Sequence, residues 1–224
     1  MHTIFVMITI LQHGEHEPAG TIEDTLKEGA ESFTILRLYE GDAIPSDPPE
    51  RLIILGGQMS VNDEREFPFL PEEKQLVKKA VAHGSSVLGI CLGAQMIAAA
   101  CGKKVYAGEK ELGWRTINGC HAPGKRFFPG EFDVFHWHKE TFDLPEGASL
   151  LATGKAVKNQ AFMLKKALGV QFHPEVTKEI IDSWANDLGA DERALILKDS
   201  EEKMAENRFL CDAIIHAFLA GWRW

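Results

Sequence analysis

A cysteine at a sharp turn is the side chain of this sequence best suited to act as a nucleophile. Cys91 follows an apolar run, Ser86–Ile90, and precedes a helical pattern that begins at Leu92. Gly89 and Gly93 lie two residues on either side, where a strand-to-helix elbow leaves no room for a side chain. The helix start offers free N–H groups and a positive potential, which favour a thiolate. We expect an exposed thiol at the apex; the alternative is an inert core cysteine.

A histidine and a glutamate form the second chemical pattern. His173 and Glu175 follow the apolar run at 168–172, with Pro174 between them. Residues i and i+2 of an extended chain point to the same side, so the carboxylate can orient one ring nitrogen while the other faces a partner. Together with Cys91 they supply a nucleophile, a general base and an orienting group, each at the end of a predicted strand.

A double glycine supplies the third pattern. Gly56 and Gly57 follow a predicted strand at 51–55. Acyl transfer through a tetrahedral intermediate usually needs two oxyanion donors, and the loss of one costs about 3 kcal/mol of transition-state stabilisation. We therefore assign the Gly57 N–H as a second donor beside the Leu92 N–H. The alternative is an ordinary turn after a strand.

The segments at 89–95 and 169–175 resemble the class I (triad) glutamine amidotransferase family. The run at 55–61 is similar to that family's oxyanion segment, although Gln58 stands where the family usually has proline. The segments at 11–20, 111–114 and 135–142 resemble its stand-alone branch, which is related to the glutaminase part of GMP synthase. The resemblance covers about residues 3–176 and implies a flavodoxin-like α/β fold.

The resemblance also implies roles for individual residues. It makes Cys91 the nucleophile, His173 the base and Glu175 its orienting group, with Gly57 and Leu92 in the oxyanion hole. Leu92 stands where many relatives have tyrosine, a change that leaves the backbone donor in place. The substrate-binding residues that it implies are Gly56, Gln95, Trp137, His138, Lys139 and Glu140. Three of these, Trp137, Lys139 and Glu140, replace the Ser, Gly and Asp of the GMP synthase version, so the donor is glutamine or another γ-glutamyl compound.

The activity implied by the resemblance is hydrolysis of the γ-amide of glutamine through a γ-glutamyl thioester. The ammonia would pass to a partner synthase, because the sequence contains no synthase domain and no Gly-rich Lys-Ser/Thr phosphate loop. One alternative is a stand-alone γ-glutamyl hydrolase or peptidase. Another is a non-catalytic regulatory or redox-sensing protein with the same fold. None of these activities calls for a cofactor.

Four histidines raise the question of a metal: His13 with His16, and His136 with His138. A zinc site needs three or four ligands, and no acid or thiol is evident beside the second pair, so we expect no metal. Glu17, together with His13, follows the first predicted strand, where both residues either line the rim of the site or play a structural role.

Composition excludes several classes of protein. The net charge is -9 and the sequence has no lysine or arginine cluster, so nucleic acid is not an expected partner. No apolar run reaches the roughly 18 residues of a membrane span, and residues 1–12 read as a first strand rather than a signal peptide. Four cysteines without metal-site or disulfide spacing indicate a reducing, cytoplasmic compartment.

The elements that must position these residues alternate between strands and helices. We expect an α/β fold: an open, mainly parallel twisted sheet with helices on both faces, a small antiparallel addition at 103–172 and a helical C-terminal tail. The strands are predicted at 3–11, 33–38, 51–55 and 86–90, with helices from a capping box at Thr21 and from Pro71 to Gly84.

We also expect a single domain over 1–224, with its core at 3–176 and the helical extension at 177–224. One predicted stripe of that tail holds Phe209, Ala213, Ile214 and Phe218, and Trp222 and Trp224 follow it. The tail either packs on the sheet or binds a partner, which includes a second copy of this chain.

Overall fold

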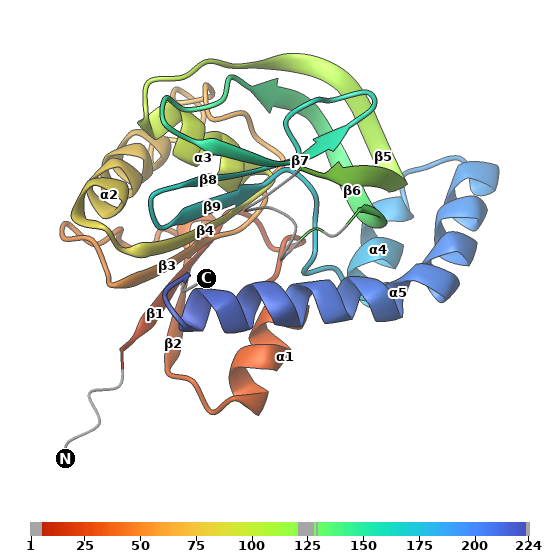
Figure 1. Cartoon of the computed structure of the whole chain (residues 1–224), viewed down its shortest axis with the longest axis horizontal. Helices are drawn as coiled ribbons and strands as arrows, with labels where there is room; N and C mark the ends of the chain where they lie inside the picture. Colours follow the sequence, from red (N-terminus) through yellow and green to blue (C-terminus); the bar gives the residue numbers. More distant parts are fainter. Residues whose placement is uncertain (1–5, 121–127, 129, 223–224) are drawn as a thin grey trace.

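The computed structural model describes residues 6–120, 128 and 130–222. Within those residues, nine strands form one sheet in the order β2-β1-β3-β4-β9-β8-β7-β5-β6 (Figure 1). The strands are β1 (Ile8–Gln12), β2 (Phe33–Arg37), β3 (Arg51–Ile54), β4 (Ser86–Ile90), β5 (Val105–Gly119), β6 (Glu131–Phe142), β7 (Ser149–Gly154), β8 (Ala161–Leu164) and β9 (Ala167–Val170).

The sheet is parallel in one half and antiparallel in the other. Strands β2, β1, β3, β4 and β9 run parallel, whereas β8, β7, β5 and β6 pair in antiparallel fashion. The predicted mainly parallel core and its antiparallel addition are confirmed. Each of the four predicted strands is present; the first begins at Ile8, and residues 3–5 of that prediction lie outside the described residues.

Helices cover both faces of the sheet, as predicted. They are α1 (Thr21–Glu28), the short 3₁₀ helix η1 (Leu38–Glu40), α2 (Leu70–His83), α3 (Leu92–Ala100), α4 (Lys178–Ala185) and α5 (Ala190–Leu219). Two separate clusters of buried side chains lie against the sheet, one shared with α2 and α3 and the other with α1 and α5. Figure 1 shows α5 crossing beneath the sheet beside α1.

Two helix starts show where local patterns succeed and fail. Helix α2 has Pro71 in its first turn and ends at Gly84, whose φ is 85°, as predicted. The N-cap of helix α1 is Gly20, and Thr21 does not form the predicted capping box. Gly20 has a φ of 50°, and a Cβ there would lie 2.3 Å from the Glu175 carbonyl oxygen, so only glycine fits.

The helical tail packs on the sheet, which confirms the first of the two expectations for it. Ile214, Phe218 and Trp222 are buried in the cluster that also contains Ile8 and Ile10 of β1. The predicted stripe was wrong about Phe209, whose side chain is 76% exposed. Residues nine apart are two and a half helical turns apart, so Phe209 and Phe218 point to opposite sides. Trp224 lies outside the described residues.

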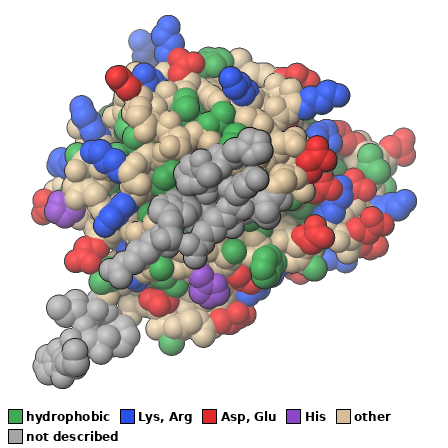
Figure 2. Space-filling model, viewed as in Figure 1, with side chains coloured by type: hydrophobic (Ala, Val, Ile, Leu, Met, Phe, Trp, Pro, Cys, Tyr) green, Lys and Arg blue, Asp and Glu red, His purple; other side chains and the backbone are tan. Residues whose placement is uncertain are grey.

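The surface agrees with the charge analysis. On the face drawn in Figure 2, lysine and arginine side chains are interspersed with aspartate and glutamate. No helix within the described ranges has an apolar stretch long enough to cross a bilayer. The absence of a nucleic-acid partner stays a prediction.

Candidate active site

Cys91 lies at a strained elbow between β4 and α3. Its φ and ψ are 50° and -102°, an unusual conformation for a residue with a Cβ. Its N–H donates to the Val170 carbonyl at 2.8 Å, which ties the elbow to β9. A Cβ on Gly93 would lie 2.2 Å from the Ile54 carbonyl oxygen, and one on Gly89 would lie 2.4 Å from the Gly93 oxygen. Both glycines are therefore needed for close packing, as predicted.

His173 and Glu175 are held together beyond the end of β9. The His173 Nδ1 lies 2.7 Å from Glu175 Oε1, and both side chains are buried. The segment is anchored by its backbone: the His173 N–H donates to the Phe135 carbonyl at 2.8 Å, and the Asn207 amide donates to the Pro174 carbonyl at 2.9 Å. The sequence predicted this carboxylate–imidazole pair.

The second nitrogen of His173 is directed at the cysteine. Within the described residues, Nε2 is buried and makes no hydrogen bond of ordinary geometry. Burial opposes a positive charge on the ring, but the Glu175 carboxylate and the Cys91 sulfur together raise the pKa of His173 to about 10. A thiol, an imidazole and a carboxylate thus follow one another in the order that nucleophilic catalysis needs.

The two glycines after β3 lie against this group. A Cβ on Gly56 would lie 2.9 Å from His173 Cε1 and 3.8 Å from the Cys91 Cβ. A Cβ on Gly57 would lie 2.7 Å from the Leu92 Cδ2. The structure therefore brings the double glycine, the start of α3 and His173 together at one rim of the sheet, the carboxyl ends of the strands.

The predicted exposure of the thiol was wrong. Cys91 is 5% exposed, because β6 and the segment after β9 lie against its side chain. Its sulfur lies 4.0 Å from the Trp137 carbonyl oxygen of β6 and 3.6 Å from the Gln171 Nε2. Trp184 of α4 packs edge-on against His173, with 4.9 Å between ring centroids, and donates to the His16 carbonyl at 2.7 Å.

The predicted substrate-binding residues occupy different surroundings. Gln95 is buried, and its Nε2 lies 3.2 Å from the Glu140 carbonyl and 3.3 Å from Gln171 Oε1, close to the sulfur. Trp137 reaches Cys91 through its carbonyl, as described above. The ring of His138 is turned into a separate buried cluster, and Lys139 is exposed.

His13 and Glu17, the two residues left open after β1, are both buried. Burial opposes the charge of His13, but the Glu73 carboxylate raises its pKa above the usual value. Burial also raises the pKa of Glu17, although a hydrogen bond from Gln58 and the charges of nearby histidines, including His173, act in the opposite direction. Glu17 therefore lies within the electrostatic reach of the site.

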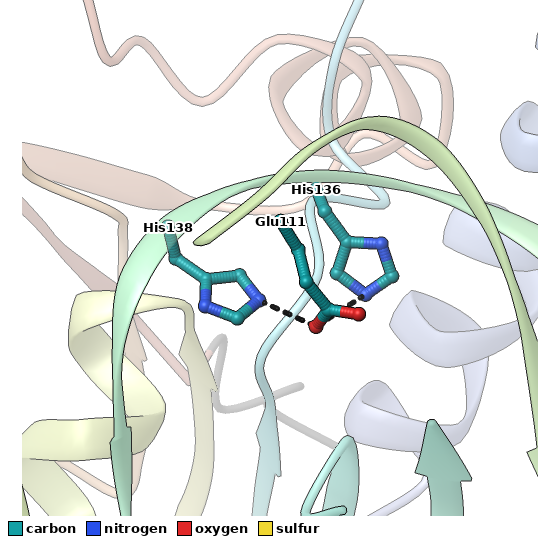
Figure 3. Close-up of side chains that lie close together, drawn as sticks. All are labelled: Glu111, His136 and His138. Atoms are coloured by element: carbon teal, nitrogen blue, oxygen red, sulfur yellow. Dashed lines mark ion pairs between the residues drawn. The ribbon is translucent and has the colours of Figure 1, made fainter. Parts of the chain in front are cut away.

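An acid does lie beside the second histidine pair, which corrects the sequence analysis. In the β5–β6 ladder Glu111 is directly opposite His138, and His136 is two residues further along (Figure 3). Glu111 Oε2 lies 3.1 Å from His138 Nε2 and 4.0 Å from His136 Nε2. One ligand atom from each of the three residues lies within 4.8 Å of the others, close enough for the group to hold a metal ion.

Gln160 occupies the hydrogen-bonding positions of that cluster. Its Nε2 donates to Glu111 Oε2 at 2.8 Å and to the Val157 carbonyl at 3.1 Å, so its Oε1 accepts from His136 Nε2 at 2.9 Å. The His136 nitrogen that a metal would need therefore carries a proton. The donor set fits a buried hydrogen-bonded network better than a metal, and the absence of a metal stays a prediction.

Sequence reasoning missed several residues of the site. Gln171 lies inside the quoted 169–175 segment, and its contact with the cysteine follows from the register of β9 beside β4. Glu73 and Trp184 lie on helices whose apolar stripes gave no sign of a polar contact. No local signal identifies them, because their partners come from distant segments of the chain.

Comparisons with known proteins agree with this arrangement. The family model "Glutamine amidotransferase class-I" matches residues 21–183. The glutamine amidotransferase-like protein YfeJ of Salmonella typhimurium is 30% identical over 181 residues, which cover 76% of each chain. A glutamine-hydrolysing GMP synthase of Thermomicrobium roseum is 33% identical over 77% of this chain but only 32% of its own length.

Solved structures give the same assignment. A glutamine amidotransferase from Thermotoga maritima superposes with a TM-score of 0.87 at 32% identity, covering 96% of this chain and 98% of that one. A second, from Methylobacillus flagellatus, has a TM-score of 0.89 at 26% identity, with 97% and 95% covered. Family model, relatives and fold all point the same way, and this chain belongs to the class I glutamine amidotransferase family.

Proposed function

We propose that this protein hydrolyses the γ-amide of glutamine through a thioester on Cys91. The observation that carries the proposal is the arrangement of three buried side chains, Cys91, His173 and Glu175. Glu175 Oε1 lies 2.7 Å from His173 Nδ1 and orients the ring, which leaves Nε2 facing the sulfur of Cys91. Membership of the amidotransferase family supports this assignment.

The chemistry uses only these side chains and the nearby backbone. The Cys91 thiolate attacks the γ-carbonyl carbon, and the N–H groups of Gly57 and Leu92 hold the oxyanion. The protonated His173 gives its proton to the leaving nitrogen, and ammonia departs. His173 then takes a proton from water, which attacks the thioester and releases glutamate and the thiol.

The amino-acid end of the substrate needs polar contacts beside the sulfur. We propose that Gln95 and the backbone of 137–140 provide them, since Gln95 already binds the Glu140 carbonyl and the Trp137 carbonyl lies next to Cys91. Gly56 contributes space there rather than a side chain, because a Cβ would press on His173. Trp137 and Trp184 provide an aromatic wall, with 5.8 Å between their ring centroids.

A stand-alone γ-glutamyl hydrolase is the second candidate. The lengths of the relatives support it. The match to YfeJ covers 76% of both chains, whereas the match to the GMP synthase covers only 32% of that longer protein. In the first candidate the ammonia passes to a partner synthase, whereas in the second an amine is released to solvent. For both candidates we propose a cytoplasmic location, where the catalytic thiol stays reduced; self-association stays a prediction.

Intact-protein mass spectrometry after incubation with 6-diazo-5-oxo-norleucine tests the site. We expect one adduct on Cys91 in the native protein, none in Cys91→Ala, and a large loss of labelling in His173→Ala. Cys101→Ala is the matched control, because this half-buried cysteine lies at the other end of α3 and should label like the native protein. Ammonia release from glutamine is measured in parallel with cleavage of a γ-glutamyl dipeptide.

The outcomes separate the candidates. Turnover of glutamine that depends on Cys91 supports the amidotransferase assignment, and preference for the dipeptide supports the hydrolase. No adduct at high reagent concentration with a reduced thiol, together with no turnover of either substrate, would overturn both and favour a regulatory or redox-sensing protein.

A further inference from the structure

His13 lies immediately after β1, behind the double glycine, and both of its ring nitrogens are occupied. Its Nδ1 lies 3.0 Å from the Gly56 carbonyl oxygen, and its Nε2 lies 2.9 Å from Glu73 Oε1 in the first turn of α2. The side chains of His13 and Glu73 are both fully buried. A buried ion pair is costly to form, so its position needs an explanation beyond packing.

The hydrogen-bond partners define where the protons lie. A backbone carbonyl can only accept, so Nδ1 carries a hydrogen and donates to Gly56. The carboxylate of Glu73 then holds a second proton on Nε2. Burial lowers the pKa of His13, but the charge of Glu73 and its hydrogen bond to the ring help to raise that pKa above its usual value. Glu73 therefore keeps His13 in the form that donates to the Gly56 carbonyl.

Anchoring that carbonyl fixes the next amide group. In a trans peptide the C=O of one residue and the N–H of the next point in opposite directions. Two consecutive glycines have little intrinsic preference for one orientation, because no Cβ restricts their dihedral angles. The bond from His13 to the Gly56 oxygen thus sets the direction of the Gly57 N–H, beside the Leu92 side chain at the start of α3.

We propose that His13 and Glu73 are positioning residues that lock the Gly56–Gly57 peptide in the orientation that stabilises the oxyanion. This inference rests on the proposed function, because it assigns the Gly57 N–H to a tetrahedral intermediate. Neither residue touches the substrate. Their effect is on the transition state, so the loss of the lock lowers kcat and leaves KM nearly unchanged.

A pair of nearly isosteric double variants tests the lock. His13→Asn with Glu73→Gln removes both charges but keeps an amide N–H where Nδ1 stands, whereas His13→Leu with Glu73→Gln removes the donor as well. Both variants lose the ion pair and should lose similar stability. We expect the Leu variant to lose about 100-fold or more in kcat, the effect of one missing oxyanion donor, and the Asn variant to stay within about 10-fold of the native protein.

Crystal structures of the two variants supply a readout that does not depend on catalysis. The Gly56 carbonyl should keep its direction in the Asn variant and turn in the Leu variant. Equal loss of kcat in both variants, or an unturned carbonyl in the Leu variant, would refute the positioning role. If the native protein neither turns over substrate nor reacts with the diazoketone, the proposed function fails, while the direction of the carbonyl still decides whether His13 locks the peptide.

Discussion

At the scale of single residues, the balance between burial and neighbouring charges gives two buried histidines of this protein opposite protonation states. His173 faces a carboxylate and a sulfur, and its pKa rises to about 10 despite burial. Burial is the dominant effect at His136, which lies further from Glu111 and beside a second histidine, and it lowers the pKa of that ring to about 4. His136 is therefore neutral in the folded protein at neutral pH, and in the unfolded chain it becomes protonated below about 6.5.

This difference predicts acid sensitivity. Between pH 6.5 and about 4 the unfolded chain binds a proton at residue 136 that the folded protein does not, so the free energy of unfolding falls as the pH falls. The slope from this residue is at most about 1.4 kcal/mol per pH unit. His136→Gln keeps a donor for Gln160 without titrating, so urea unfolding at several pH values should show a shallower loss. Equal slopes in the two proteins would contradict the prediction.

At the scale of elements, the antiparallel pairing of β5 with β6 creates the buried cluster of Figure 3. The Nδ1 of His138 faces the Glu140 carbonyl at 3.1 Å and therefore carries a hydrogen. One further proton must lie between His138 Nε2 and Glu111 Oε2, since two bare acceptors 3.1 Å apart would repel. The carboxylate thus joins His138 to Gln160 across the two strands.

Two substitutions of Glu111 should separate hydrogen bonding from charge. Glu111→Leu leaves Gln160 and His138 without their buried partner, and we expect it to lower the free energy of unfolding by about 3–5 kcal/mol. Glu111→Gln can keep an amide oxygen at the position of Oε2, where it still accepts from Gln160, so its loss should be smaller by about 1 kcal/mol or more. Chemical denaturation of both variants measures this, and equal losses would show that the charge is what matters.

The sequence predicted the parts of the site that depend on local structure. The elbow at Cys91 and the His173–Glu175 pair each need only a strand end and the residues next to it, and both form as predicted. The burial of Cys91 and the carboxylate beside His138 could not be predicted, because they depend on the β5–β6 register, which includes a bulge between Ala107 and Glu111. The Glu73 contact depends on how α2 packs, which no short pattern encodes.

At the scale of the whole molecule, the C-terminal helix belongs to the core beneath the sheet. Ile214, Phe218 and Trp222 lie in the same buried cluster as residues of β1 and β4, while Asn207 of the same helix holds the loop that carries His173. We propose on this basis that residues 1–224 fold as one domain and that the tail is part of its cooperative unit. The site and the tail should then lose their structure together.

Two phenylalanines of α5 provide a matched test of this unit. Phe218 is fully buried, whereas Phe209, on the opposite side of the helix, is 76% exposed. We expect Phe218→Ala to lower the free energy of unfolding by about 3–5 kcal/mol. Phe209→Ala should change it by about 0.5 kcal/mol or less.

The choice of probes decides whether the unit is cooperative. Trp222 packs on Phe218, with 5.8 Å between ring centroids, so the fluorescence is measured with Trp114, Trp222 and Trp224 replaced by phenylalanine. Trp184 and Trp137 then report changes beside His173, while far-ultraviolet circular dichroism reports the helices, of which α5 is the longest described. In one cooperative unit both signals shift to the same lower denaturant midpoint in Phe218→Ala. If only the dichroism shifted, the tail would unfold independently, and the geometry of His173 would not depend on the packing of α5 beneath the sheet.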